Sequence, residues 1–161
     1  MKVVIFGASG KTGSLLVEQA LVSGYEVIAY VRRAQSVTSE HPNLKVITGT
    51  LSDRTKLKEA ISGSDVCIST LGGNSLTKHA FEFMSGIENI VAVMEQEKVK
   101  KLLYMSSVGA GESRYLMTPV PRFLVVDVLL RIPLADHTTN EKCITDSNLD
   151  WTIIRPGGLT D

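Results

Sequence analysis

The seven residues GASGKTG, from Gly7 to Gly13, join glycines to a lysine and a threonine, a combination typical of loops that bind phosphate. Two kinds of phosphate loop share these residue types. The P-loop of ATPases and kinase-like proteins needs a further glycine five positions before its Gly-Lys-Thr, so that backbone N–H groups wrap the phosphates. The residue at that position is Ile5, inside an apolar run. The spacing therefore excludes a P-loop.

The glycines instead form a G-x-x-G-x-x-G pattern, directly after the apolar run VVIF and directly before a predicted helix. This context is typical of a dinucleotide-binding loop, in which Gly7 permits a tight turn, Gly10 lets backbone approach a pyrophosphate and Gly13 lets the helix close on the sheet. Further donors in the loop are Ser9, Lys11 and Thr12. We therefore predict a pyrophosphate at the helix N-terminus, where unpaired N–H groups and the helix dipole favour negative charge.

The end of the second predicted strand selects the cofactor, because the adenosine ribose lies there. An acidic residue would bind the free 2′-hydroxyl of NAD, whereas arginine accepts the 2′-phosphate of NADP. The chain has Arg32 and Arg33 at this point. Planar guanidinium groups suit a phosphate. The sequence thus favours NADP, with NADPH preferred over NADH; the alternative is that both arginines are solvated surface residues.

Segments after the other strands should surround the reactive end of the cofactor, because ligands bind at the carboxyl ends of parallel strands. Gly72 and Gly73 either let backbone pass close to the cofactor or form a plain turn. Ser106 and Ser107 either bond a ligand or cap the end of a strand. The cofactor contacts that we predict after these strands are Thr50, Leu51, Leu71, Gly72, Gly73, Ser106 and Pro156.

A catalytic proton donor is harder to identify. Many reductases with such a sheet use a tyrosine with a lysine four residues later, which lowers the tyrosine pKa. None of the four tyrosines has such a lysine. The three histidines lack metal-ligand spacing, and no G-x-S-x-G motif supports a serine hydrolase. Taken alone, His137 is most simply a histidine on a helix surface.

Alternating strands and helices must position these segments. Apolar runs rich in β-branched residues predict buried parallel strands at 3–6, 27–31, 44–48, 66–70, 102–106 and 151–155. Helices are predicted at 11–22, 54–61, 78–97 and 136–147, with Gly24 ending the first. The alternation predicts an α/β fold of Rossmann type, a doubly wound parallel sheet in three layers, α/β/α. The proline-containing segment 109–133 is either a loop with a short helix or a lid over the substrate.

Composition limits the partners. The 161 residues, 43% apolar and 21% charged, suffice for one packed core, so we expect a single domain over 1–161. Seventeen basic residues balance seventeen acidic ones, which gives no reason to expect nucleic acid or a membrane as partner. Cys67 and Cys143 lack the spacing of a metal motif and favour a reducing cytoplasm. We expect a cytoplasmic monomer or homodimer that acts on a small molecule.

Four segments together, VVIFGASGKTG, VRR, LLYMSSVGAG and LDWTIIRPGGLTD, resemble the atypical short-chain dehydrogenase/reductases of the NmrA-like group, which bind NAD(P). Within that group the chain is most similar to the biliverdin-IXβ/flavin reductase type, which also has the VPRFL segment at 120–124 and the pair Asp136-His137. The resemblance covers essentially the whole chain. It implies direct hydride transfer from the nicotinamide to a stacked flavin, quinone or tetrapyrrole.

The resemblance also implies roles for two residues. In relatives with the tyrosine-lysine pair, the lysine falls at the position of His137 and the tyrosine at that of Pro133, which makes His137 an active-site residue. Ser107 would donate a hydrogen bond to the substrate. The chain departs from the group at Thr50, where many relatives have aspartate after a glycine. Members also usually continue for some tens of residues beyond Asp161, so we expect either a missing substrate-side extension or an unusually open pocket.

These observations support two hypotheses. The first is an NADPH-dependent reductase in which Ser107 and His137 meet the hydride acceptor. The second is a non-enzymatic NADP(H) sensor that passes redox state to a protein partner, as NmrA-like relatives do. The lack of a tyrosine-lysine pair and the apolar segment FLVVDVLLRI at 123–132 motivate the second hypothesis.

Overall fold

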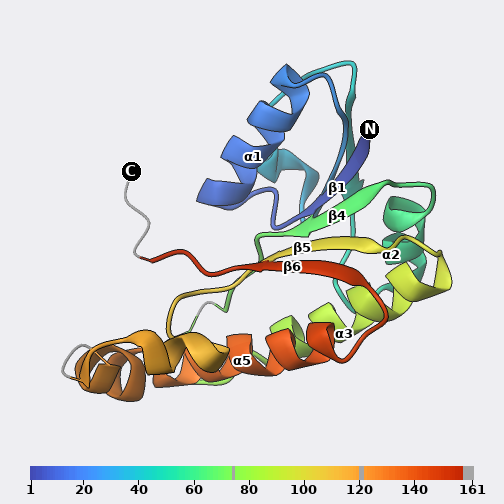
Figure 1. The fold of residues 1–161 in the computed structure, drawn as a ribbon. Coiled ribbons are helices and arrows are strands. Elements are labelled where there is room, and N and C mark those ends of the chain that lie inside the picture. Colours follow the sequence, from blue (N-terminus) through green and yellow to red (C-terminus); the bar gives the residue numbers. More distant parts are fainter. Residues whose placement is uncertain (74, 120–121, 158–161) are drawn as a thin grey trace.

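The computed structural model describes residues 1–73, 75–119 and 122–157 (Figure 1). Parts of three segments discussed above lie outside the described residues: Asn74 after the glycine pair, Val120 and Pro121 of VPRFL, and 158–161 of RPGGLTD.

The core of the fold is a sheet of six parallel strands. Its strands are β1 (Lys2–Phe6), β2 (Glu26–Val31), β3 (Leu44–Thr48), β4 (Val66–Ser69), β5 (Lys101–Met105) and β6 (Asp150–Ile154). Their order is β3-β2-β1-β4-β5-β6, and Val3 of β1 pairs with Val27 on one side and Val66 on the other. The direction of winding thus reverses between β1 and β4, the place where sheets of this kind bind ligands. The predicted Rossmann-type fold is confirmed.

Helices cover both faces of the sheet (Figure 1). Helix α1 (Lys11–Val22) packs its buried residues Val17, Ala20 and Leu21 against one face. The other face is covered by α2 (Arg54–Ile61), α3 (Phe81–Gln96) and α5 (Arg131–Thr145). Strand residues alternate between the two faces, so that Val3 and Ile5 face α1 while Val4 and Phe6 face the opposite layer. The layers are therefore those predicted, α/β/α.

Two helices begin elsewhere than predicted. Helix α3 starts at Phe81 rather than at residue 78, and its N-cap residue, Ala80, donates its N–H to the Asp136 carboxylate of another helix. Helix α5 runs over Arg131–Thr145, so the predicted start at 136 was wrong. Proline usually interrupts a helix, so Pro133 indicates a later start than the one observed. In the first turn of a helix a proline is tolerated, because the N–H that it lacks would have no partner within the helix.

The segment 109–133 is more helical than a loop with one short helix. It contains a 3₁₀ helix, η2 (Gly111–Leu116), and a π-helix, η3 (Arg122–Leu129), before α5 begins. In Figure 1 this region lies beyond the ends of the strands, on the α5 side of the molecule. Within the described parts of the chain, no helix combines the length and apolar character needed to cross a membrane.

Two residues of the glycine loop, Gly7 after β1 and Gly13 in the first turn of α1, are packed too tightly to carry a side chain. Gly7 has a φ of +81°, and a Cβ atom there would lie 2.8 Å from the Thr70 hydroxyl. A Cβ atom on Gly13 would collide with the backbone carbonyl of Gly7. Helix α1 therefore approaches the end of β1 as closely as it does only because residue 13 is glycine.

Replacing Gly13 with alanine should destabilise the fold. The new methyl group meets backbone that cannot swing away, at a cost of about 1–3 kcal/mol, which exceeds the gain of roughly 1 kcal/mol that alanine brings to a helix. Chemical denaturation would measure the loss. Gly72→Ala is the matched control, because a Cβ atom on Gly72 meets nothing within 4 Å. Equal stability of the two variants would contradict this packing.

Candidate functional site

The first helix offers backbone donors at its N-terminus. Gly10 is the N-cap residue and provides no side-chain cap, and the first turn of α1 contains no acidic residue. The first N–H groups of any helix lack carbonyl partners within it and attract anions. Because the Gly10 N–H donates to the Gly7 carbonyl at 2.9 Å, the loop turns sharply at the end of β1. A sharp turn that ends at a helix N-terminus is the geometry that the predicted pyrophosphate site requires.

The end of β4 is fastened to this loop. The Thr70 hydroxyl donates to the carbonyl oxygens of Phe6 at 3.0 Å and Gly7 at 3.3 Å. Leu71 then turns back to pack against the core, Gly72 is exposed, and Gly73 approaches Ala80 closely. Thr70 thus ties the glycine loop to the segment that carries the predicted contacts Leu71, Gly72 and Gly73.

The predicted ribose pocket lies past the end of β2. Arg32 and Arg33 follow Val31, the last residue of the strand, and both are exposed. The adjacent strand β3 ends near Thr50, whose carbonyl accepts a hydrogen bond from the Tyr30 hydroxyl at 2.8 Å. Burial raises the pKa of Tyr30 to about 12, so this hydroxyl keeps its proton. Thr50 is therefore held by β2, next to the two arginines.

Leu51 has a structural role that the sequence did not indicate. Its carbonyl accepts a hydrogen bond from the Asn89 amide at 3.1 Å, and its side chain packs against Gly86 of α3. The turn after β3 is thereby fixed to the helical layer. Whether Leu51 also touches a cofactor remains a prediction.

The segments after β5 and β6 run side by side. Beyond the last strand pair, the Ser106 N–H donates to the Ile154 carbonyl at 2.8 Å and the Val108 N–H donates to the Pro156 carbonyl at 2.9 Å. Ser106 is buried and Ser107 is partly exposed. Ser107 makes a long bond of 3.3 Å to the Val108 carbonyl. This geometry leaves the Ser107 hydroxyl able to turn toward a ligand.

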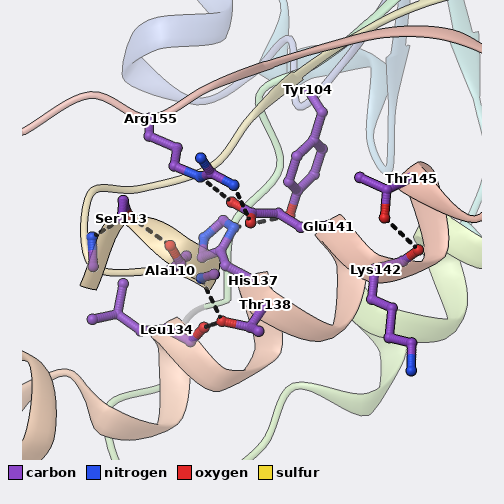
Figure 2. A network of polar contacts seen from close by, with 12 residues as sticks. Tyr104, Ala110, Ser113, Leu134, His137, Thr138, Glu141, Lys142, Thr145 and Arg155 are labelled. Atoms are coloured by element: carbon purple, nitrogen blue, oxygen red, sulfur yellow. Dashed lines mark hydrogen bonds and ion pairs between the residues drawn. The ribbon is translucent and has the colours of Figure 1, made fainter. Parts of the chain in front are cut away.

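The His137 side chain lies beside that of Tyr104, a residue of β5, and is only partly exposed (Figure 2). Its Nδ1 atom is 2.8 Å from the Tyr104 hydroxyl oxygen. Its ring lies edge-on to the Phe83 ring, with 5.3 Å between the two ring centroids. Burial lowers the pKa of His137, so the ring is neutral near pH 7. The Asn140 amide, one helical turn later, donates to the same Tyr104 oxygen at 3.3 Å.

An ion pair lies next to this histidine. Arg155 donates to both carboxylate oxygens of Glu141, at 2.8 and 2.7 Å (Figure 2). The Glu141 side chain is 5% exposed and that of Arg155 is 32% exposed. Burial raises the pKa of Glu141, but the bonds from Arg155 outweigh it, so the pKa lies below its ordinary value. The buried Ser106 hydroxyl also helps to lower that pKa, although it makes no well-formed hydrogen bond among the described residues.

A second buried carboxylate connects α5 to the segment after β4. Asp136 is 1% exposed. It accepts hydrogen bonds from the Ala80 N–H at 2.8 Å and from His79 Nδ1 at 2.5 Å. Gly73 lies beside both Ala80 and Asp136. Asp136 therefore positions the turn that is predicted to pass close to the nicotinamide.

All the predicted site residues that the structure describes lie beyond the carboxyl ends of their strands or on the start of α1, apart from His137, which lies on α5. Sequence reasoning missed the polar network around His137. Its members outside α5 are Tyr104, Arg155 and His79. One signal was available: residues 136, 137, 140 and 141 are polar and follow helical spacing, which predicts one shared face. Their partners come from segments far away in the sequence, and no spacing rule finds those.

A cavity of about 610 Å³ adjoins this network along the next face of α5. Its walls include Gly109, two residues after Ser107, and Thr138, next to His137. Arg114 and Asp127 also line it and form an ion pair at 2.8 Å. The cavity is therefore bordered by both apolar and charged groups.

Comparisons with known proteins also indicate a domain that binds a nicotinamide cofactor. A family model described as NAD(P)H-binding matches residues 7–161. An uncharacterized chloroplast protein of Arabidopsis thaliana is 29% identical over 98% of this chain and 59% of its own length. The photosystem II assembly factor Ycf39 of Synechocystis is 23% identical over 99% of this chain and 45% of its own length. The chain thus spans less than two thirds of either relative.

Solved structures share the fold. ChuY, an anaerobilin reductase from Escherichia coli O157:H7, superposes with a TM-score of 0.79 at 25% identity, over 99% of this chain and 74% of that one. A short-chain dehydrogenase/reductase from Veillonella parvula in complex with NADP superposes with a TM-score of 0.79 at 21% identity, over 96% of this chain and 68% of that one.

Replacing Glu141 with glutamine should destabilise the protein in a pH-dependent way. The loss at about pH 7 should be about 1–3 kcal/mol, less than for a fully buried pair because Arg155 keeps access to water. The folded protein lowers the pKa of Glu141. The Glu141–Arg155 pair therefore stabilises the folded protein fully at pH values above the pKa of glutamate in the unfolded chain, about 4.3. The stabilisation is lost as the pH falls through the lower pKa that Glu141 has in the folded protein.

Urea unfolding of both proteins at about pH 7 and about pH 4 would measure this, and the difference in unfolding free energy should shrink at the lower pH. Glu18→Gln, at an exposed position of α1, is the control and should leave stability nearly unchanged at either pH. A difference that stays constant with pH would show that Glu141 acts through packing alone.

Proposed function

The chain belongs to the NAD(P)H-binding family, among the atypical short-chain dehydrogenase/reductases, and on this premise we propose that it is an NADPH-dependent reductase that transfers hydride to a flavin, quinone or tetrapyrrole-like acceptor. The observation that carries the proposal is the start of α1, where closely packed glycines and the N-terminus of a helix meet at the reversal of strand order. Such a site suits the pyrophosphate of a dinucleotide.

The cofactor would extend along the carboxyl ends of the strands. Its pyrophosphate would lie on Gly7, Gly10, Thr12 and Gly13, its adenosine half toward β2 and β3, and its nicotinamide half toward β4 and β5. Arg32 and Arg33 support NADPH as the preferred form, because both are exposed directly after β2. Two guanidinium groups bind a phosphate with charge-assisted hydrogen bonds that a ribose hydroxyl does not offer.

The bound nicotinamide would supply the hydride, and the residues of this chain would orient the acceptor. Ser107 lies just after β5 and His137 lies on α5, and both elements would border the nicotinamide half. The neutral His137 ring suits an uncharged, ring-shaped acceptor, and the chain has no tyrosine-lysine pair that would protonate an alkoxide. Acceptors that can be reduced without a strong acid, such as flavins and quinones, are best suited to these side chains.

A non-enzymatic NADP(H) sensor is the second candidate. It is favoured by the similarity to a photosystem II assembly factor, a relative whose name denotes assembly rather than catalysis. The lack of a tyrosine-lysine pair agrees with it too.

Turnover distinguishes the two candidates. With NADPH and either FMN or a simple quinone, the reductase should oxidise the nicotinamide, which is followed as a fall in its absorbance. A sensor would bind NADPH tightly, leave both acceptors unreduced and retain a protein partner only when the nucleotide is present. Failure to bind either nucleotide would overturn both candidates.

A double change, Arg32→Ala with Arg33→Ala, should weaken NADPH binding by about 10- to 100-fold, because each charge-assisted bond contributes about 1.5–3 kcal/mol and part is regained by water. Binding of NADH should hardly change, since it lacks the 2′-phosphate. Titration of both nucleotides by fluorescence or calorimetry measures the two affinities.

The control removes an equivalent pair of charges elsewhere. Lys100 and Lys101 are adjacent, exposed and located at the amino end of β5, the opposite edge of the sheet. Changing both to alanine should leave the affinities for NADPH and NADH as they are. If the arginine variant lost both nucleotides equally, the 2′-phosphate pocket would have to lie elsewhere.

A further inference from the structure

The Tyr104 hydroxyl stands at the centre of a hydrogen-bond chain. Tyr104 is fully buried on β5. Its oxygen is 2.8 Å from Nδ1 of His137 and 3.3 Å from the side-chain amide nitrogen of Asn140 (Figure 2 shows the Tyr104 and His137 side chains). Both partners belong to α5, so one strand residue meets two positions of the same helix.

The direction of each bond follows from the available protons. The Asn140 amide nitrogen has hydrogens and no lone pair to offer, so it donates to the Tyr104 oxygen. Tyr104 has a single proton, which burial holds in place by raising the hydroxyl pKa. That proton must point to the other partner, Nδ1 of His137. Nδ1 therefore accepts and carries no hydrogen of its own.

Burial lowers the pKa of His137 and keeps the ring neutral near pH 7, although the nearby Glu141 and Asp136 carboxylates act to raise that pKa. Both carboxylates already have partners of their own. Glu141 is bound by Arg155, and Asp136 is bound by His79 and the Ala80 N–H. The Phe83 ring packs edge-on against the imidazole. A neutral imidazole has one N–H, and with Nδ1 unprotonated it lies on Nε2. The described part of the chain offers Nε2 no hydrogen-bond partner, and the ring keeps partial exposure.

We propose that Tyr104 and Asn140 are positioning residues that hold His137 in its Nε2–H form, so that His137 presents a fixed hydrogen-bond donor to a lone pair on the hydride acceptor. The identity of the ligand rests on the proposed function, whereas the protonated nitrogen does not. The acceptor class is narrowed to molecules with a carbonyl oxygen or an unprotonated ring nitrogen near the reacting carbon or nitrogen.

The hydrogen bonds from Asn140 to Tyr104 and from Tyr104 to His137 make His137 a hydrogen-bond donor but a poor source of a proton. If Nε2 gave up its proton, the ring would become an anion unless Tyr104 passed its own proton to Nδ1. The Tyr104 oxygen would then carry a buried negative charge, with only Asn140 to stabilise it. In the proposed reaction, hydride adds to the acceptor as the nicotinamide is oxidised, and the accompanying proton comes from water.

Nitrogen NMR of the full chain with ¹⁵N-labelled histidine tests the tautomer directly. In the wild type near pH 7, the Nδ1 resonance of His137 should lie in the range of an unprotonated nitrogen, and Nε2 in that of a protonated one. Tyr104→Phe should mix the two forms, whereas Tyr115→Phe, at a position 72% exposed, should not. The wild-type spectrum suffices even if Tyr104→Phe fails to fold, and a hydrogen on Nδ1 would overturn the proposal.

Two conservative variants test the donor in turnover. Glutamine at position 137 places an amide nitrogen where Nε2 was, and asparagine places one where Nδ1 was. The kcat/KM for FMN or the quinone should be about tenfold lower in His137→Asn than in His137→Gln, the effect of one hydrogen bond. NADPH affinity should be equal in both.

The two lines of evidence separate the possible failures. A protonated Nε2 in a protein that reduces no acceptor would contradict the proposed function and leave the tautomer standing. Turnover with an unprotonated Nε2, or with glutamine no better than asparagine, would contradict the role of His137 as donor and leave the reductase standing.

Discussion

The burial of a polar stripe on α5 is the constraint on which the site depends. Residues Asp136, His137, Asn140 and Glu141 all face the ends of the strands, and three of them are less than 5% exposed. A buried polar group is costly unless it is hydrogen-bonded. Each of the four has a partner, and the partners come from three different segments: the turn before α3, strand β5 and the residue after β6. Few placements of α5 satisfy them all.

This constraint joins the two halves of the site. On the cofactor side, the glycine loop is fastened to the end of β4 by the Thr70 hydroxyl. On the other side, α5 holds the turn that follows β4 through Asp136 and the end of β6 through Glu141. The segment around Gly73 is therefore held from both directions. A nicotinamide placed beside it would meet His137 and Ser107 in a framework that does not depend on the ligand.

The site has exposed positive charge at its β2 end and paired charges around His137. The exposed arginines lie at the end of β2, where only the adenosine half of a dinucleotide would reach. Near His137 the carboxylates are paired and the ring is neutral. An uncharged acceptor would thus enter a region with fixed dipoles and little net charge. That arrangement is suited to hydride transfer, in which orientation matters more than acid strength.

The amino-acid sequence by itself determined the fold and predicted where a dinucleotide cofactor would bind. Strand and helix patterns repeat over short distances, and the glycine spacing and the arginines after β2 are local signals, so they could be recognised without tertiary contacts. The start of α5 was misjudged because Pro133 signals a break, whereas only the helix geometry shows that it occupies the first turn.

The acceptor end was decided by the tertiary structure. Tyr104 has no lysine four residues later, so its sequence context predicts no role, yet its hydroxyl contacts His137, 33 positions away. Arg155, which follows β6, forms an ion pair with Glu141 of α5, 14 positions earlier in the sequence. Such pairs depend on how α5 lies against the strand ends, and many helix placements share the same apolar pattern. The polar partners, which must all be satisfied together, select one of them.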